Sequence, residues 1–234
     1  EKPPAISLAD TLKIEYLLNQ QNGLAIQFGF NHRYLSHYKS LKKMVASKEY
    51  GDPLWVRGVY GKGFDESFFS GWRANRDLSG GGILLDQGIH MLDLVLDLLG
   101  DLTVEHASID TSGGDQSIDL NSFIQLRSAT KVPVSIHSSM YQWHHKFSLE
   151  VGTEKAIIGI DGIKSSTRSY GEESIRIDRH WHNNFVESQV NQYANPDYYT
   201  FKEECADFVD AIMNNRPPAL GTMRDAVRIM KLID

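Results

Sequence analysis

Residues 121–160 read NSFIQLRSATKVPVSIHSSMYQWHHKFSLEVGTEKAIIGI. Short segments in which apolar residues alternate with polar ones recur in this stretch, and this pattern is typical of β-strands. The breaks between them are short, and Gly152-Thr-Glu154 has the composition of a hairpin turn. Such short breaks favour antiparallel pairing, because parallel strands need a long crossover connection. The strands predicted here are Asn121–Arg127, Val132–Tyr141, Lys146–Gly152 and Lys155–Ile160.

The sequence on either side adds further strands and several helices. The additional predicted strands are Leu24–Phe30, Leu54–Gly61, Thr103–Asp110 and Ser174–Asp178. Apolar residues at helical spacing predict helices over 5–20, over 35–51, from Gly82 to Leu99, and twice after residue 200, where Thr200/Glu203 and Thr222/Asp225 resemble capping boxes. Residues 63–79 and 181–197 have no clear period and are predicted to be loops. This order predicts an α+β fold, a large and mainly antiparallel sheet with helices packed on one face.

Composition narrows the class of protein. The chain has 234 residues, is 41% hydrophobic and carries a formal net charge of −6. This acidic balance argues against nucleic acid or an anionic membrane surface as a partner, and no apolar run reaches transmembrane length. The single cysteine, Cys205, excludes an internal disulfide and predicts a cytoplasmic, reducing environment. Its apolar neighbours predict that it lies on a buried helix face. A half-covered sheet also predicts a homo-oligomer formed through the open face.

The strongest chemical signal is the segment GGGILLDQGIHMLD, residues 80–93. On a helix Asp86 and His90 share one face, and Asp93 and Asp97 continue the same stripe among Leu, Ile, Val and Met residues. Buried ionisable groups need a polar network or a pocket, and a His beside an Asp can transfer a proton near neutral pH. The preceding glycines allow a substrate or a backbone segment to approach closely. The alternative is that His90 is a hydrogen-bonded core histidine and Asp86 a charge at a helix N-terminus.

Other residues add weaker candidates. Lys2, ahead of a proline-started helix, would orient a hydroxyl group or would be a surface lysine. Arg33, at the end of a predicted strand, would bind a carboxylate or phosphate, or form a structural ion pair. Trp72 and Arg73 would stack on a sugar ring or anchor their loop. A metal site is a further alternative. Asp86 and His90 would be two of its ligands and His180 with His182 could supply more, although the spacing in the sequence does not reveal the third and fourth ligands.

These pieces, taken in order, resemble the Gfo/Idh/MocA family, named for glucose–fructose oxidoreductase and inositol dehydrogenase. The matching segments are Glu1-Lys2-Pro3, Gly29-Phe-Asn-His-Arg33-Tyr34, Trp72-Arg73, Gly80-Gly-Gly, Asp86 to Asp93, and Phe208-Val-Asp-Ala-Ile212 with Arg216-Pro-Pro. The resemblance implies an N-terminal Rossmann domain followed by a C-terminal α/β domain. It implies that Lys2 contacts the substrate and the nicotinamide region, that Pro3 lies beside the cofactor, and that His90 is the acid/base, supported by Asp86.

The resemblance also leads to an expectation about the extent of the chain. No G-x-G-x-x-G turn is present, so we expect residues 1–30 to be the end of the dinucleotide-binding domain and residues 31–234 to be the substrate-binding and catalytic domain. NAD or NADP would then be bound mostly by an absent N-terminal half, and this chain alone would be inactive. The intact protein is expected to oxidise or reduce a sugar, a sugar derivative or a cyclitol. Alternatives are a non-catalytic sugar-binding or regulatory relative, and a metal-dependent sugar isomerase or hydrolase.

Overall fold

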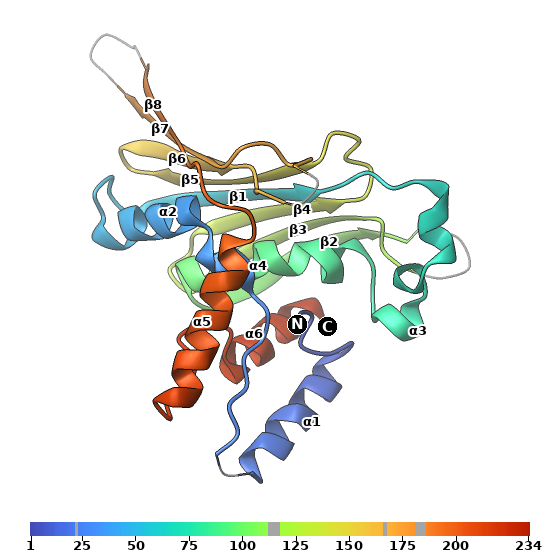
Figure 1. Cartoon of the computed structure of the whole chain (residues 1–234). Coiled ribbons are helices and arrows are strands. Elements are labelled where there is room, and N and C mark those ends of the chain that lie inside the picture. Colours follow the sequence, from blue (N-terminus) through green and yellow to red (C-terminus); the bar gives the residue numbers. More distant parts are fainter. Residues whose placement is uncertain (22, 112–117, 166–167, 181–185) are drawn as a thin grey trace.

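The computed structural model describes residues 1–21, 23–111, 118–165, 168–180 and 186–234. The described strands form one eight-stranded sheet in the order β2-β3-β4-β1-β5-β6-β7-β8, and the helices lie on one side of it (Figure 1). This confirms the predicted α+β class. The strands are β1 (Pro53–Gly61), β2 (Leu102–Asp110), β3 (Asn121–Ser128), β4 (Pro133–Ser139), β5 (Lys146–Thr153), β6 (Ala156–Asp161), β7 (Ser174–His180) and β8 (Val186–Gln192).

Strand pairing is antiparallel throughout this sheet except between β1 and β4. Those two strands run in parallel, with Val56 opposite Val134 and Gly61 opposite Ser139. A parallel pair needs a long crossover, and the chain between β1 and β4 supplies one that contains α4 (Ile89–Leu99) and strands β2 and β3. The crossover packs residues Leu84–Gly88 against β1 and β4, and it packs α4, the helix that carries His90, against β1.

One face of the sheet is covered, and the other is open. Along β3, Ile124 and Leu126 are buried on the covered face. Phe123, which directly precedes Ile124 and points to the other face, is 47% exposed. The buried face packs against α2 (Ser36–Ser47) and α4, and each large apolar side chain enclosed there stabilises the fold by about 1.5–3 kcal/mol. Fully buried members of this core are Tyr38, Leu41, Leu92, Leu94, Ile136, Phe147 and Leu149.

The two C-terminal helices differ in how they begin. The predicted capping box of α6 (Met223–Ile233) is confirmed, because Thr222 accepts a hydrogen bond from the Asp225 amide at 3.2 Å and Asp225 accepts one from the Thr222 amide at 2.9 Å. The box predicted for α5 (Tyr199–Met213) is wrong. Thr200 lies inside the first turn of α5, where its buried hydroxyl accepts a hydrogen bond from the Asn31 amide at 3.4 Å.

Three further predictions are wrong in ways that tertiary contacts explain. Residues 24–30 are extended but lie outside the sheet, since the Phe28 amide binds the Gly221 carbonyl and the Gly29 amide binds the Glu1 carbonyl. Part of the region predicted to be a loop, residues 181–197, is strand β8, while residues 181–185 lie outside the described residues. Cys205 is exposed, not buried, because the apolar side of α5 faces solvent.

The remaining helix is α1 (Leu8–Asn19), which contacts α6 (Figure 1). Ser7 caps it by accepting a hydrogen bond from the Asp10 amide at 3.1 Å, which satisfies one of the free amides of the first turn. The loop predicted at 63–79 holds short helical turns, including α3 (Arg76–Ser79). Among the described residues, every helix is too short or too polar to cross a lipid bilayer.

Candidate active site

The Asp86 carboxylate binds two lysines that come from distant parts of the sequence. The Lys2 ammonium is 3.1 Å from Asp86 Oδ1 and also donates to the Asp86 carbonyl, and the Lys62 ammonium is 2.7 Å from Asp86 Oδ2. Burial acts to raise the pKa of the Asp86 carboxyl, but Lys2 and Lys62 outweigh it and lower the pKa to about 2. The carboxylate is therefore ionised at neutral pH and held in one orientation, with Lys2 fixed beside it.

A wide helical turn carries Asp86. Residues Leu84–Gly88 form one turn of π-helix, which runs directly into α4. The amides of Gly82 and Leu84 each donate a hydrogen bond of 2.7 Å to the Asp119 carboxylate, and the Ile83 amide donates one of 2.8 Å to the Asp119 carbonyl. Asp119 thus satisfies free amides at the start of the turn, an arrangement that resembles a helix cap. The chain that precedes β3 thereby positions the turn that bears Asp86.

Gly82 is required by this contact. A Cβ atom at Gly82 would lie 1.8 Å from the Asp119 carbonyl oxygen, so no other residue fits there without a backbone shift. Of the two roles foreseen for the triple glycine, close approach of a backbone segment is the one found at this position. We expect Gly82→Ala to lower the free energy of unfolding by at least about 1–3 kcal/mol, the usual cost of overpacking.

The matched control for Gly82→Ala is Gly81→Ala. A Cβ at Gly81 would lie 3.3 Å from the Leu85 Cβ, a contact that a shift of a few tenths of an ångström relieves. Urea unfolding of the two variants compares them directly. Equal stability of the Gly82→Ala variant and the wild type would contradict the close contact with Asp119.

His90, one turn further along, lies in an aromatic environment. Its ring stacks on His32 with centroids 3.8 Å apart and planes 22° from parallel, and Tyr60 lies 6.3 Å away. Both imidazoles are almost completely buried. Burial is the largest cause that holds the pKa of His90 well below its usual value, and the neighbouring His32 and Lys2 lower it further. His90 is therefore uncharged at neutral pH.

The predicted contact between Asp86 and His90 takes a different form in the structure. Asp86 is bound by the two lysines and His90 by His32, and no hydrogen bond joins Asp86 to His90 among the contacts of the described residues. The π-turn accounts for this difference, because its hydrogen bonds run from i to i+5 and residues four apart no longer align as on an α-helix. Lys2, which influences both groups, links them electrostatically.

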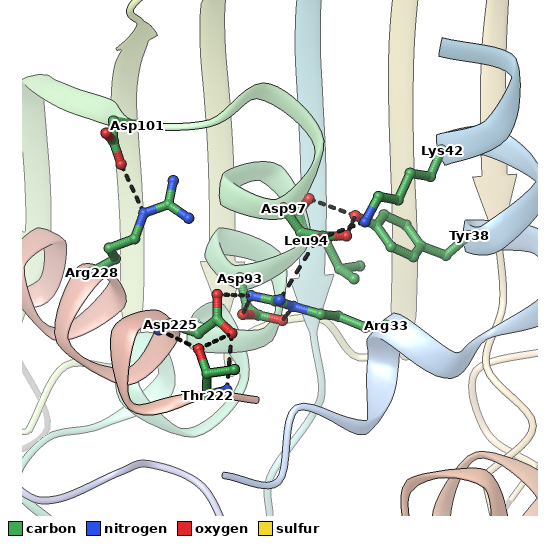
Figure 2. Close-up of polar contacts among 10 residues, drawn as sticks. All are labelled: Arg33, Tyr38, Lys42, Asp93, Leu94, Asp97, Asp101, Thr222, Asp225 and Arg228. Atoms are coloured by element: carbon green, nitrogen blue, oxygen red, sulfur yellow. Dashed lines mark hydrogen bonds and ion pairs between the residues drawn. The ribbon is translucent and has the colours of Figure 1, made fainter. Parts of the chain in front are cut away.

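The rest of the predicted stripe belongs to a buried ion-pair network (Figure 2). Arg33 binds both oxygens of Asp93, at 2.9 and 2.6 Å, and its guanidinium also lies 3.2 Å from Asp225 and 3.6 Å from Asp97. Only 5% of Arg33 is exposed. The sequence left two roles open for Arg33, a substrate contact and a structural ion pair. The structure shows the structural ion pair, because the guanidinium nitrogens of Arg33 all face carboxylates of the protein. Arg33 therefore joins η1 (Asn31–Tyr34) to α4 and α6.

A cavity of about 120 Å³ brings together candidates from three distant parts of the sequence. Lys2 and Pro3, Trp72 and Arg73, and Asp86 all line it. Arg73 stacks over the Trp72 ring at 4.4 Å, and Trp72 is 56% exposed. The apolar part of the lining is supplied by Phe68, Ile83, Leu85 and Met140. A larger hollow of about 680 Å³ lies between residues 23–26, the end of α5 and the start of α6, but none of the predicted site residues lines it.

Three side chains of the site were missed by sequence reasoning. Lys62 directly follows β1, and its position at the end of a predicted strand was the available signal. His32 lies within the segment Asn31–Tyr34 that had drawn attention only for Arg33. Tyr170 receives a 2.7 Å hydrogen bond from Gln87, and burial raises the pKa of Tyr170 to about 12. Tyr170 is far from the other residues in sequence and had no local signal.

The described residues contain no cluster of ligands for the metal site that the sequence left open as an alternative. Within the ranges that the structure describes, no three or more His, Cys, Asp and Glu side chains are grouped so that they could hold a metal ion. His182, one of the predicted ligands, lies outside the described residues. The Asp86 carboxylate is occupied by two ammonium groups instead.

Comparison with known protein families shows one match that covers more than half of the chain. Residues 38–159, more than half of the chain, match the model of the GFO/IDH/MocA C-terminal domain. The chain belongs to the Gfo/Idh/MocA family. The matched region extends from α2 to β6 and includes Lys62, the cavity residues Trp72 and Arg73, and the Asp86–His90 segment.

Relatives of this Gfo/Idh/MocA chain with known activities are sugar oxidoreductases. The 1,5-anhydro-D-fructose reductase of Ensifer adhaerens is 26% identical over 164 residues, which cover 68% of this chain and 48% of the relative. The D-glucoside 3-dehydrogenase of Escherichia coli is 30% identical over 108 residues, 43% of this chain and 28% of the relative. The chain thus matches about half or less of the length of these curated relatives.

Solved structures share the fold at lower identity. Aldose-aldose oxidoreductase from Caulobacter crescentus, complexed with glycerol, has a TM-score of 0.80 at 21% identity over 98% of this chain and 65% of its own. A 3-ketoreductase from Actinomadura kijaniata, in complex with NADP and TDP-benzene, has a TM-score of 0.79 at 16% identity over 98% of this chain and 66% of its own. These likenesses show a shared fold: nearly the whole of this chain matches about two thirds of each of the two structures.

Proposed function

We propose that this protein transfers a hydride between a nicotinamide cofactor and a carbinol carbon of a sugar, sugar derivative or cyclitol. One observation carries the proposal: Lys2, Asp86, Trp72 and Arg73 converge on one cavity, and a buried neutral His90 lies one turn beyond Asp86. The activities of the two relatives, a 1,5-anhydro-D-fructose reductase and a D-glucoside 3-dehydrogenase, agree with it.

The residues present suit the nicotinamide end of NAD or NADP. Lys2 and Pro3 line the cavity beside an apolar surface of Phe68 and Met140, which fits a flat ring with a polar amide. The sequence has no G-x-G-x-x-G turn, so these residues would hold no more than that end of the cofactor. When bound, the nicotinamide accepts or donates the hydride.

The roles of the side chains follow from their environments. His90 is kept neutral by burial and lies one turn beyond the cavity residue Asp86, without lining the cavity itself. Its Nδ1 is enclosed, so Nε2 would take the proton of the substrate hydroxyl as the carbon is oxidised. Lys2 would donate a hydrogen bond to the same oxygen, and Asp86 would hold the Lys2 ammonium in place. Trp72 and Arg73, at the mouth of the cavity, would stack on the sugar ring and donate to its hydroxyl groups.

A spectroscopic assay tests the proposal on the natural protein that carries this sequence. The protein is incubated with NAD or NADP and a panel of sugars, sugar acids, sugar nucleotides and inositols, and formation of reduced nicotinamide is recorded. We expect substrate-dependent reduction that Lys2→Met lowers and Lys13→Met leaves intact, since Lys13 forms only an exposed ion pair with Asp10. If no member of the panel supports reduction, the non-catalytic sugar-binding alternative takes its place.

We also propose that the open face of the sheet joins two copies of this chain. Phe123 of β3 and Ile157 of β6 are 47% and 37% exposed, and both lie on strands whose outer face the α-helices leave uncovered. We expect light scattering to give a dimer mass for the wild type and a monomer mass for Phe123→Lys, because a buried unpaired ammonium is costly. A wild-type monomer at all concentrations would rule out this interface.

A further inference from the structure

His90 lacks the hydrogen bond that ordinarily orients a functional histidine. In most such residues one ring nitrogen is bound to a carboxylate or carbonyl, which sets both the tautomer and the plane of the ring. Here His90 Nδ1 is buried without a hydrogen-bond partner among the described residues. The Asp86 carboxylate, one turn earlier, is already engaged by Lys2 and Lys62. Something other than a hydrogen bond must hold the ring.

His32 supplies a flat surface against the His90 ring. The two rings lie 3.8 Å apart with an interplanar angle of 22°, which is face-to-face contact. His32 has a fixed orientation of its own. Its Nδ1 lies 2.9 Å from the Asn31 side-chain oxygen and its Nε2 lies 3.3 Å from the Tyr60 hydroxyl. The Asn31 oxygen can only accept, so His32 carries its proton on Nδ1 and accepts from Tyr60 at Nε2.

A chain of contacts keeps His32 in this state. The Asn31 amide group donates to Thr200 of α5, which assigns the amide oxygen to the His32 side. Tyr60 packs edge-on against Phe147 at 5.3 Å, and Phe147 also lies 5.7 Å from His32. Burial lowers the pKa of His32 to about 3, so at neutral pH the surface offered to His90 is an uncharged ring. The elements η1, β1, β5 and α5 therefore all contribute to one rigid support.

We propose that His32 is a positioning residue that fixes the ring plane of His90 by stacking, in place of the usual hydrogen bond to Nδ1. This deepens the proposed function, since it concerns how the proposed acid/base is oriented. His32 touches no substrate in this role. Without its flat surface, the His90 ring has no partner on Nδ1 to stop it from turning about its side-chain bonds.

Two substitutions at one position separate the stacking surface from the hydrogen bonds of His32. His32→Leu removes both the flat surface and the polar contacts, whereas His32→Phe keeps a flat aromatic ring and loses only the contacts to Asn31 and Tyr60. Side-chain NMR of the full chain, labelled with ¹⁵N and ¹³C at histidine, reports on the His90 ring, and His90→Asn identifies its signals. We expect one sharp set of His90 signals in the wild type and in His32→Phe, and broadened or doubled signals in His32→Leu.

Several results would overturn the proposal. Unchanged His90 signals in His32→Leu would show that stacking is not needed, and equal broadening in His32→Phe and His32→Leu would assign the effect to the lost hydrogen bonds. Absence of cross-peaks between the His32 and His90 ring protons in the wild type would exclude the stack itself, and this measurement decides the matter even if the leucine variant does not fold. His144→Leu, at an exposed site, is the control and should leave the His90 signals unchanged.

Kinetics of the natural protein give a second, separable readout. His32→Leu should lower kcat by roughly 10²-fold, the typical effect of a small misplacement of a reacting group, with little change in KM, and His32→Phe should restore most of the rate. A loss that appears in KM instead would contradict a positioning role. If the wild type transfers no hydride, the proposed function fails, while the NMR measurement still tests the stack.

Discussion

Replacing His90 by Asn should lower the turnover of substrate by about 10²–10⁴-fold and leave cofactor binding intact. Asparagine can still donate and accept hydrogen bonds, but it cannot take up a proton. Burial and the neighbouring Lys2 keep His90 in the neutral form that a proton acceptor needs. Steady-state rates for wild type and His90→Asn, with nicotinamide fluorescence to follow cofactor binding, provide the measurement.

His144→Asn is the matched control for this experiment, because His144 is an exposed histidine, whereas His90 is buried one turn from the cavity residue Asp86. It should keep the wild-type rate. A His90→Asn variant with wild-type turnover would remove His90 from the proposed acid/base role. A variant that has lost its cofactor as well would point to a binding role for His90 instead of proton transfer.

Replacing Arg33 by Met should lower the free energy of unfolding by about 3–5 kcal/mol, the largest stability effect that we expect for a single substitution in this chain. The methionine keeps much of the volume but removes the charge that Asp93, Asp97 and Asp225 share (Figure 2). Breaking a buried ion pair on one side leaves the carboxylates desolvated and uncompensated. Denaturant unfolding monitored by circular dichroism gives the value.

Arg57→Met is the control, because Arg57 pairs with Glu150 on the exposed face, where ion pairs contribute little to stability.

The loss in free energy of unfolding that Arg33→Met causes, called the deficit below, should also depend on pH. Burial already raises the pKa of Asp93 to about 7, against the opposing influence of Arg33, and the pKa of Asp93 should rise further in the variant. A carboxyl group whose pKa is raised by folding weakens the folded state between its unfolded pKa, about 4, and its folded pKa. Wild type and variant therefore lose stability in parallel up to about pH 7, and above that pH only the variant loses more, so the difference should grow there. A deficit that shrinks with rising pH would contradict this network.

Much of the fold was predictable because local pattern and tertiary burial agree. In β3, β4 and β5 the apolar residues mark the face that α2 and α4 cover, so the pattern along the chain and the packing contain the same information. Strand β8 was missed because it lies at the edge of the sheet and its mostly polar sequence, VESQVNQ, carries no core signal. It is ordered by backbone hydrogen bonds to β7, which depend on no particular side chain.

Helix α5 illustrates a limit of periodicity. The spacing of Phe201, Cys205, Val209 and Ile212 correctly predicted a helix with an apolar side. Periodicity identifies which side chains lie together, but it does not identify what covers them. In the structure Phe201, Val209 and Ile212 are each more than half exposed.

By itself, the sequence determined the class of fold, the position of the helix that carries Asp86 and His90, and the membership of Lys2, Trp72 and Arg73 in one candidate site. These depend on local periodicity and on motifs whose residue types carry their own chemistry. Only the tertiary structure decided which partner each charged side chain has: Asp86 binds Lys2 and Lys62, while Arg33 serves the core. Those pairings join residues from 24 to 84 positions apart, and free energies of burial and ion pairing over such separations depend on the folded geometry.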